Sequence, residues 1–222
     1  IGIGMSGGTD SSLAAHLLAE QGCEVRGFTL RLWSEPSTKS SEAHIERART
    51  VAAKLGIAHR VVDLGEAFRR RIVGPFVDEY ARGRTPSPCV RCNAAVKFGL
   101  MLELALADGC SALATGHYVR AERNAVGRFG LRRGADAAKD QSYFLAGLGQ
   151  EQLERARFPL GDMEKRAVKA LADSLGLVPH SQAESQDLCF VPDGDCAAFL
   201  ARQRPDLVRP GAIVTLDGRE LG

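Results

Sequence analysis

The first half of the chain alternates short apolar runs with longer amphipathic segments. The apolar runs predict strands, and segments with apolar residues three or four positions apart predict helices. Strands are predicted over 1–5, 24–32, 58–64 and 111–115, and helices over 11–21, 42–55, 66–82 and 96–108. Strands that alternate with helices in this way predict an α/β fold, with a parallel sheet covered by helices on both faces.

The second half follows a different pattern and is more helical. Its clearest element is an amphipathic helix over 163–175, which ends at Gly176. Apolar residues in the last part of the chain are spaced among polar ones and predict short β structure. We therefore expect three parts, which are an α/β domain over 1–150, a helical segment over 151–205 and the start of a β-structured unit over 206–222. Since the chain begins inside a strand, we expect it to be part of a longer protein.

Residues 4–12, Gly-Met-Ser-Gly-Gly-Thr-Asp-Ser-Ser, join the first strand to the first helix. Adjacent glycines let the backbone bend sharply and approach a ligand. The N–H groups of the turn and of the helix start then converge where the helix dipole favours an anion. Asp10 can hold a magnesium ion that bridges phosphates. The segment predicts a pyrophosphate-binding loop; the alternative is a serine-rich helix cap. The Lys-Ser/Thr ending of a Walker loop is absent, which excludes a P-loop kinase or GTPase.

Cysteines supply the second candidate chemistry. Cys89 and Cys92 follow two prolines and are expected on a rigid loop, and Cys189 comes much later. From the residues alone, the Cys-x-x-Cys pair is half of a zinc site or a redox pair, although no second Cys/His pair has zinc spacing. Six cysteines are too few for a secreted disulfide scaffold. With no apolar run near the ~20 residues of a membrane span, we expect a cytoplasmic protein.

Charge is distributed unevenly. The whole chain has a net charge of +2, but residues 80–133 contain nine Lys or Arg residues against three acidic ones. Such a stretch attracts a phosphate backbone. The alternative is an ordinary solvated surface.

Five blocks, in this order, resemble the tRNA-specific 2-thiouridylase (MnmA/TrmU) family of the PP-loop ATP pyrophosphatases. They are residues 4–12, Arg-Thr-Pro-Ser-Pro-Cys-Val-Arg-Cys-Asn at 84–93, Ala-Thr-Gly-His-Tyr at 114–118, Lys-Asp-Gln-Ser-Tyr-Phe-Leu at 139–145 and Ser-Gln-Asp-Leu-Cys-Phe at 185–190. The resemblance covers nearly the whole chain. It implies a HUP-type, Rossmann-like PP-loop domain, a small helical domain that binds tRNA and the start of a central β-barrel. The family's C-terminal β-barrel domain is missing.

The resemblance also implies an activity, that of a tRNA-uridine 2-sulfurtransferase. ATP adenylates O2 of the wobble uridine in the anticodon loop, and pyrophosphate leaves. Sulfur from a cysteine persulfide then replaces AMP and gives 2-thiouridine. The implied partners are tRNA and a protein that donates persulfide sulfur, and the cofactors are ATP and Mg²⁺.

Site residues follow from the resemblance position by position. Cys92 matches the first catalytic cysteine and Cys189 the persulfide-carrying one, and the two would form a disulfide during turnover. Asp10 would act in catalysis by holding Mg²⁺, and either Arg91 or Lys97 would lower the thiol pKa. The implied ATP-binding residues are Gly4, Met5, Ser6, Gly7, Gly8, Thr9, Asp10, Ser11, Leu30 and Gly116. The implied tRNA-binding residues are Ser87, Pro88, Cys89, Lys139, Asp140 and Gln141.

One departure from the family leaves two routes for sulfur open. Cys89 stands where the family often has Asp. Either Cys89 is a spare thiol beside a persulfide route, which we favour slightly, or Cys89, Cys92 and Cys189 hold a [4Fe–4S] cluster with one open iron.

Two rival functions also remain, another PP-loop synthetase that adenylates its substrate and a non-catalytic RNA- or metal-binding protein. The paired cysteines argue against the first, and the complete Ser-Gly-Gly-Thr-Asp-Ser loop argues against the second.

Overall fold

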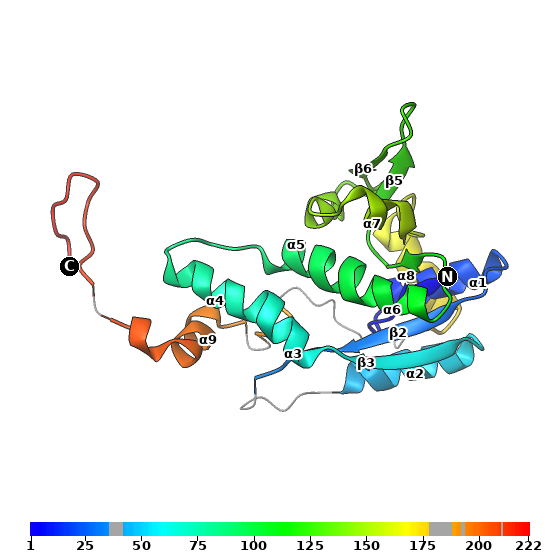
Figure 1. The fold of residues 1–222 in the computed structure, drawn as a ribbon, viewed down its shortest axis with the longest axis horizontal. Coiled ribbons are helices and arrows are strands. Elements are labelled where there is room, and N and C mark those ends of the chain that lie inside the picture. Colours follow the sequence, from blue (N-terminus) through cyan, green and yellow to red (C-terminus); the bar gives the residue numbers. More distant parts are fainter. Residues whose placement is uncertain (36–41, 178–187, 192–193, 210) are drawn as a thin grey trace.

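The computed structural model describes residues 1–35, 42–177, 188–191, 194–209 and 211–222. Five strands form one parallel sheet in the order β3-β2-β1-β4-β7, which confirms the predicted α/β class (Figure 1). The strands are β1 (Gly2–Gly4), β2 (Arg26–Arg31), β3 (Ala58–Asp63), β4 (Leu113–Ala114) and β7 (Ala156–Arg157). Because the strands are parallel, the loops that follow them meet along one edge of the sheet, where open α/β sheets bind ligands.

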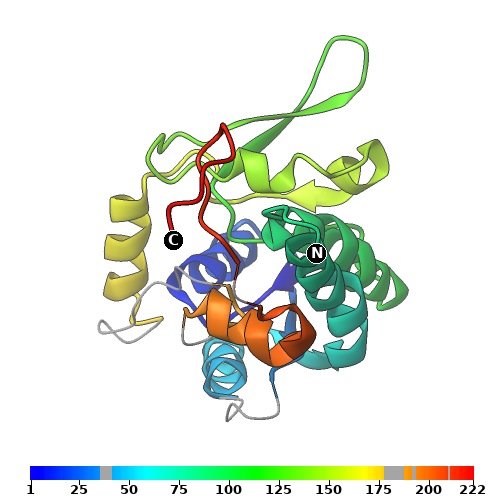
Figure 2. The ribbon, with the colours of Figure 1, turned by 90° about the vertical axis from the view of Figure 1, so that its left-hand side faces the viewer.

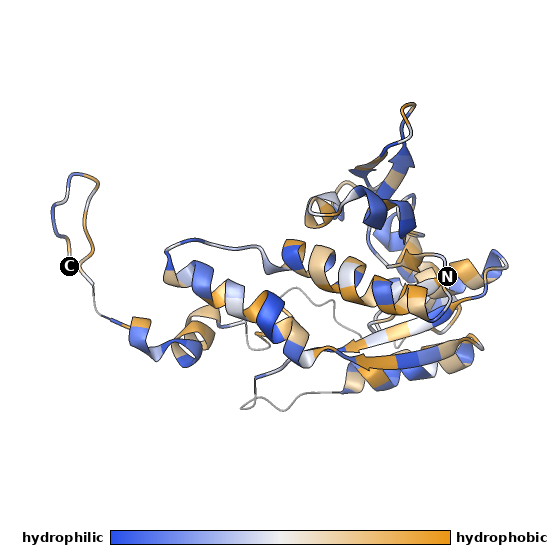
Figure 3. Ribbon diagram, viewed as in Figure 1, coloured by the Kyte–Doolittle hydropathy of each residue, from blue (hydrophilic) through white to orange (hydrophobic). Residues whose placement is uncertain are grey.

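Three helices cover one face of the sheet. They are α1 (Thr9–Glu20), α2 (Ala43–Lys54) and α8 (Lys165–Ser174). Their apolar side chains form one buried cluster with those of β1. Figure 3 shows apolar and polar residues side by side along these helices, as expected for helices that bury one face only.

A long helix covers the other face. It consists of α5 (Pro88–Cys92), the π-helical segment η2 (Asn93–Met101) and α6 (Leu102–Ala107). The prediction of a loop around the two cysteines is wrong, because the helix expected from residue 96 already begins at Pro88. Proline suits this first helical position, since its φ is preset and its missing N–H would have no intrahelical partner.

A third cluster of buried residues joins two segments that are far apart in the sequence. One is the run α3 (Gly65–Phe68), η1 (Arg69–Val73) and α4 (Gly74–Ala81), and the other is Phe190 with α9 (Cys196–Gln203). The ring of Phe190 lies edge-on to Phe68 and Phe76, with centroids 5.8 and 5.2 Å apart. These contacts anchor the described segment 188–191 on the outside of α4.

Residues 119–133 form an antiparallel hairpin that the sequence analysis missed. Its arms are β5 (Val119–Arg123) and β6 (Phe129–Arg133), and it projects from the body of the molecule (Figures 1 and 2). Its residues are mostly exposed, and each arm has only two apolar residues at alternate positions, which is too short a pattern to identify a strand. The remaining helices are η3 (Ser142–Leu145), α7 (Gln150–Arg155) and η4 (Pro205–Leu207).

Helix α8 is tied to other elements at both ends. At its start, the N–H of Lys165 donates to the Asp136 carboxylate over 3.0 Å. At its end, the Lys54 ammonium of α2 donates to the carbonyl oxygens of Leu175 and Gly176 over 2.7 and 2.8 Å. Both contacts satisfy groups that a helix terminus leaves unpaired.

The last segment makes a turn with a single β-bridge between Val214 and Glu220. The predicted start of a β-barrel stays a prediction, as does the division at residues 150 and 205. The strand β7 lies beyond residue 150, so the sheet extends into the range expected to be helical. In the described ranges, no helix is both long and apolar enough to cross a membrane.

Candidate active site

The predicted pyrophosphate loop lies between β1 and α1, at the edge of the sheet where the strands end. Gly7 adopts φ +71°, and a Cβ there would lie 2.5 Å from the carbonyl oxygen of His44 in α2. Only glycine tolerates both this backbone conformation and this contact. The loop therefore turns tightly against α2 and presents its backbone to the start of α1.

Serine hydroxyls brace the loop from inside. The Ser11 hydroxyl accepts from the Ser6 N–H and donates to the Gly8 carbonyl, each over 3.1 Å. The Ser12 hydroxyl donates to the same carbonyl over 2.8 Å. These side chains fix the turn, while the first N–H groups of α1 have no intrahelical acceptor and can bind an anion.

Gly7 and Gly83 provide a matched test of this geometry. Both have φ +71°, but a Cβ on Gly83 would meet no atom within 4 Å. We expect Gly83→Ala to cost about 1–2 kcal/mol from backbone strain alone. Gly7→Ala should cost a further ~1–3 kcal/mol from overpacking against α2 and weaken ATP binding. Urea unfolding and calorimetric ATP titration measure both effects, and equal losses in the two variants would contradict the close approach of α2.

Asp10 lies in the first turn of α1 and carries two partners that the sequence analysis did not assign. The Tyr118 hydroxyl donates to Asp10 Oδ1 over 2.7 Å. The Lys165 ammonium donates to both carboxylate oxygens over 2.8 Å. The predicted helix over 163–175 placed Lys165 inside the first turn. The helix in fact begins at Lys165, where the helix dipole opposes a cation and an anionic partner is needed.

The other predicted ATP-binding residues lie around this loop. Gly4 ends β1 and Met5 follows it. A Cβ on Gly116 would lie 2.8 Å from the Asp10 carbonyl carbon, so Gly116 packs directly against the start of α1. Leu30 lies on the neighbouring strand β2 and is partly buried. The structure thus gathers the predicted set at one edge of the sheet, and their roles in binding ATP stay predictions.

The three candidate thiols also come together. All six cysteines are free, with Cys89 and Cys189 exposed and Cys92 half-buried. Burial, together with the nearby thiolates of Cys92 and Cys89, raises the pKa of Cys189 to about 12. Although Cys189 exposes part of its surface, the surrounding atoms therefore hinder solvation of its thiolate. The anchor for Cys189 is its neighbour Phe190, in the aromatic cluster beside α4.

Lys97 provides the positive charge at these thiols. Burial raises the pKa of Cys92 and of Cys89, and the charge of Lys97 opposes the rise at both and at Cys189. Of the two cations considered from the sequence, Lys97 is therefore the one that acts on the thiols. It lies on η2, one turn beyond Cys92.

His117 links this region to the loop. Its Nδ1 lies 2.7 Å from the Thr115 hydroxyl, and its ring is buried. Burial, helped by the charge of Lys97, holds the pKa of His117 well below its ordinary value. The ring is neutral at pH 7 and serves in packing and hydrogen bonding.

The predicted tRNA-binding residues lie on two segments. Ser87, Pro88 and Cys89 form the start of α5, with Ser87 and Cys89 exposed. The other segment, 139–141, is fastened to Tyr118, since Gln141 exchanges two hydrogen bonds of 3.0 Å with its backbone. Asp140 accepts from Ser142 and Gly134. Contact of these residues with tRNA stays a prediction.

The side chains at the site offer few ligands for a metal ion. In the described residues, no group of three or more His, Cys, Asp or Glu side chains is arranged to hold a metal ion. Asp10 is a single carboxylate, which fits Mg²⁺ only where phosphate oxygens and water complete the shell. The arrangement of the three thiols gives no support to a cluster.

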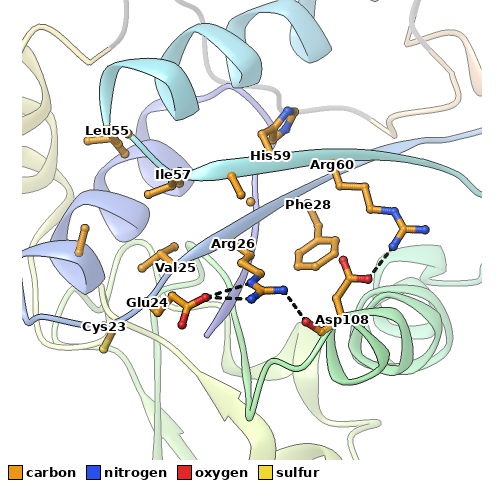
Figure 4. A pocket seen from close by; sticks show the side chains of 14 residues that line it. Cys23, Glu24, Val25, Arg26, Phe28, Leu55, Ile57, His59, Arg60 and Asp108 are labelled. Atoms are coloured by element: carbon orange, nitrogen blue, oxygen red, sulfur yellow. Dashed lines mark hydrogen bonds and ion pairs between the residues drawn. The ribbon is translucent and has the colours of Figure 1, made fainter.

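A pocket at the opposite edge of the sheet is not part of this site. It lies where β2 and β3 begin and is lined by Arg26, Arg60 and Asp108 among others (Figure 4). Arg26 is bonded to Glu24 and to the Asp108 carbonyl, and Arg60 to the Asp108 carboxylate. Because these charged groups are paired with one another, the pocket lacks the convergent polar groups of a binding site.

Comparison with known proteins identifies the family. Residues 1–193 match the family model described as tRNA methyl transferase HUP domain. The chain is 48% identical to the tRNA-specific 2-thiouridylase MnmA of Magnetococcus marinus, over 100% of this chain and 64% of that protein. It is 45% identical to MnmA 2 of a Thermoanaerobacter species, with the same coverage.

A solved structure shares the fold at lower similarity. A 4-thiouridine synthetase in complex with RNA and ATP superposes with a TM-score of 0.56 at 19% identity, over 93% of this chain and 51% of that one. This likeness supports the HUP-type PP-loop fold. The chain spans slightly less than two thirds of the length of its curated relatives. The chain belongs to the tRNA methyl transferase HUP domain family and, within it, groups with the tRNA-specific 2-thiouridylases that its motifs resembled.

Proposed function

We propose that this chain carries the catalytic part of a tRNA-uridine 2-sulfurtransferase, which replaces O2 of the wobble uridine by sulfur at the expense of ATP. One observation carries the proposal. The anion-binding loop and the three thiols share the carboxyl edge of the sheet, with Lys97 acting on the thiols and on His117 beside Gly116. A site for activating an oxygen therefore adjoins a site for delivering sulfur.

The first step activates a poor leaving group. O2 of the uridine attacks the α-phosphate of ATP, the bond to the β-phosphate breaks, and pyrophosphate leaves. The loop backbone and the start of α1 stabilise the negative charge of the leaving pyrophosphate. Magnesium held by Asp10 would neutralise part of that charge.

The second step transfers sulfur and needs two thiols. The terminal sulfur of a Cys189 persulfide attacks C2 of the activated uridine, and AMP departs with the oxygen. The Cys92 thiolate then attacks Sγ of Cys189, which breaks the S–S bond, leaves sulfur on C2 and joins the two cysteines. Each turnover uses one persulfide sulfur from a donor protein and two electrons from a thiol reductant to reopen the disulfide.

The cluster route remains the alternative for sulfur delivery. It would require Cys89, Cys92 and Cys189 as three iron ligands with one iron open. Free thiols, and the reductant that the persulfide route requires, fit a reducing compartment, and we propose the cytoplasm.

Lys97 gives a prediction with a clear sign. Only the thiolate reacts, and Lys97 favours the thiolate of Cys92 against burial. We expect Lys97→Met to raise the Cys92 pKa, so that alkylation by iodoacetamide slows at pH 8 and its pH profile moves to higher pH. Site-resolved mass spectrometry follows the rates.

Arg91→Met is the matched control, because Arg91 is an exposed cation on the neighbouring α5. The Arg91→Met profile should coincide with that of the wild type. Equal shifts in both variants would contradict a specific role for Lys97.

The proposed function is tested with the full-length protein. We expect pyrophosphate release from ATP to depend on tRNA, and 2-thiouridine to appear in digested tRNA when a persulfide donor is present. Nucleoside mass spectrometry detects the product. Pyrophosphate release without any thiolated nucleoside would favour the adenylating synthetase, and no ATP turnover would favour a non-catalytic RNA-binding protein.

A further inference from the structure

Lys165 is unusual for a lysine in two respects, its position at a helix start and its burial. It occupies the first position of α8, where the helix dipole disfavours a cation. Its side chain is only 14% exposed, which is unusual for lysine. Such a residue persists where a nearby negative charge offsets the cost.

That negative charge belongs to the pyrophosphate loop. Lys165 Nζ lies 2.8 Å from both oxygens of Asp10, although the two residues are 155 positions apart in the sequence. The Tyr118 hydroxyl donates to the same carboxylate, and the lysine ammonium lies 5.6 Å from the centroid of the Tyr118 ring. Asp136 fixes the start of α8 by accepting from the Lys165 N–H. The ammonium is thus aimed at the start of α1, where the loop would bind phosphates.

We propose that Lys165 is a pyrophosphate-binding residue of the ATP site, which Asp10 holds in place until the phosphates of the nucleotide become its partner. The inference rests on the proposed function in so far as that function requires ATP at this loop. Asp10 would share its charge with a bound magnesium ion. The flexible four-carbon stem of Lys165 lets the ammonium turn to an oxygen of the β- or γ-phosphate. A charge-assisted hydrogen bond forms to the phosphate as the bond to Asp10 breaks, so no net charge is left unpaired.

Lys169 supplies a matched control. It lies one turn further along α8, carries the same charge and is exposed. With the full-length protein and Mg²⁺, we expect Lys165→Met to weaken ATP binding on the order of tenfold and Lys169→Met to leave it unchanged. AMP, which lacks the pyrophosphate, should bind equally to all three proteins. Lys165→Arg should restore part of the loss, and thermal unfolding checks that each variant is folded.

A second set of titrations, without magnesium, tests the effect of Lys165 on ATP binding independently of the metal. In EDTA, Asp10→Asn removes the carboxylate charge that Lys165 faces, and ATP should bind about tenfold tighter to this variant than to the wild type. Adding Lys165→Met to Asp10→Asn should remove that gain, whereas adding Lys169→Met should not. Calorimetric titration of ATP measures every case.

The outcomes separate the inference from the proposed function. If Lys165→Met binds ATP as Lys169→Met does, the ion pair with Asp10 only fastens α8 to α1 and the inference is overturned. An equal loss of ATP and AMP affinity in Lys165→Met would also overturn it. If the wild type binds no ATP at all, the inference and the proposed function both fall.

Discussion

Cys92→Ser and Cys189→Ser should each abolish 2-thiouridine formation, by at least about a thousandfold. Serine hydroxyls neither carry persulfide sulfur nor displace it at neutral pH, because their pKa lies far above that of a thiol. Both variants should still release pyrophosphate from ATP in the presence of tRNA, since the activating loop is untouched. Nucleoside mass spectrometry and a pyrophosphate assay on the same samples make the comparison.

Cys89→Ser separates the two routes for sulfur. In the persulfide route, the aerobically purified variant should keep activity when a persulfide donor is supplied. In the cluster route, it should lose activity together with the iron and sulfide that the anaerobically purified wild type would contain. An iron-free wild type that still thiolates tRNA would exclude the cluster.

Asp10→Asn should lower tRNA-dependent pyrophosphate release by about 10²–10³, the size of effect seen when one group that stabilises transition-state charge is removed. The change keeps the size of the side chain and an acceptor for the Tyr118 hydroxyl, so the fold should survive. Circular dichroism and a stopped-time pyrophosphate assay test the two statements separately.

Asp162→Asn serves as the comparison for Asp10→Asn, since Asp162 is an exposed carboxylate paired only with Arg120 at 3.6 Å among the described residues. It should keep wild-type activity. Near-native turnover of Asp10→Asn would show that the loop is not the site of phosphate chemistry.

Local signals explain what the sequence could predict. The Gly7 turn, the strand before it and the helix after it are encoded by neighbouring residues, so the loop followed from nine consecutive positions. The hydrogen bonds by which Ser11 and Ser12 brace the loop were not predicted. The parallel sheet followed from the alternation of strands and helices. The family motifs then located the thiols, because they preserve spacing as well as residue type.

Tertiary contacts explain what the sequence could not predict. Lys165 and Tyr118 reach Asp10 from distant positions, and no local pattern encodes that meeting. The two prolines before Cys89 suggested a loop, although Pro88 begins a helix that packing against the sheet sustains. The hairpin β5–β6 packs on the body through Val119, Phe129 and Leu131, but its short arms left a periodic signal too brief to identify strands.

The ties of α8 have a mechanical consequence. The backbone turn at Gly7 lies close against α2. The Lys54 side chain of α2 donates to the carbonyl end of α8, and Lys165 at the start of α8 donates to Asp10. These contacts connect the phosphate loop, α2, α8 and α1 in a closed circuit, so none of these elements is held at one end only. A displacement at any one of these three contacts strains the other two. The conformation of the loop is therefore rigid and is set before a nucleotide binds.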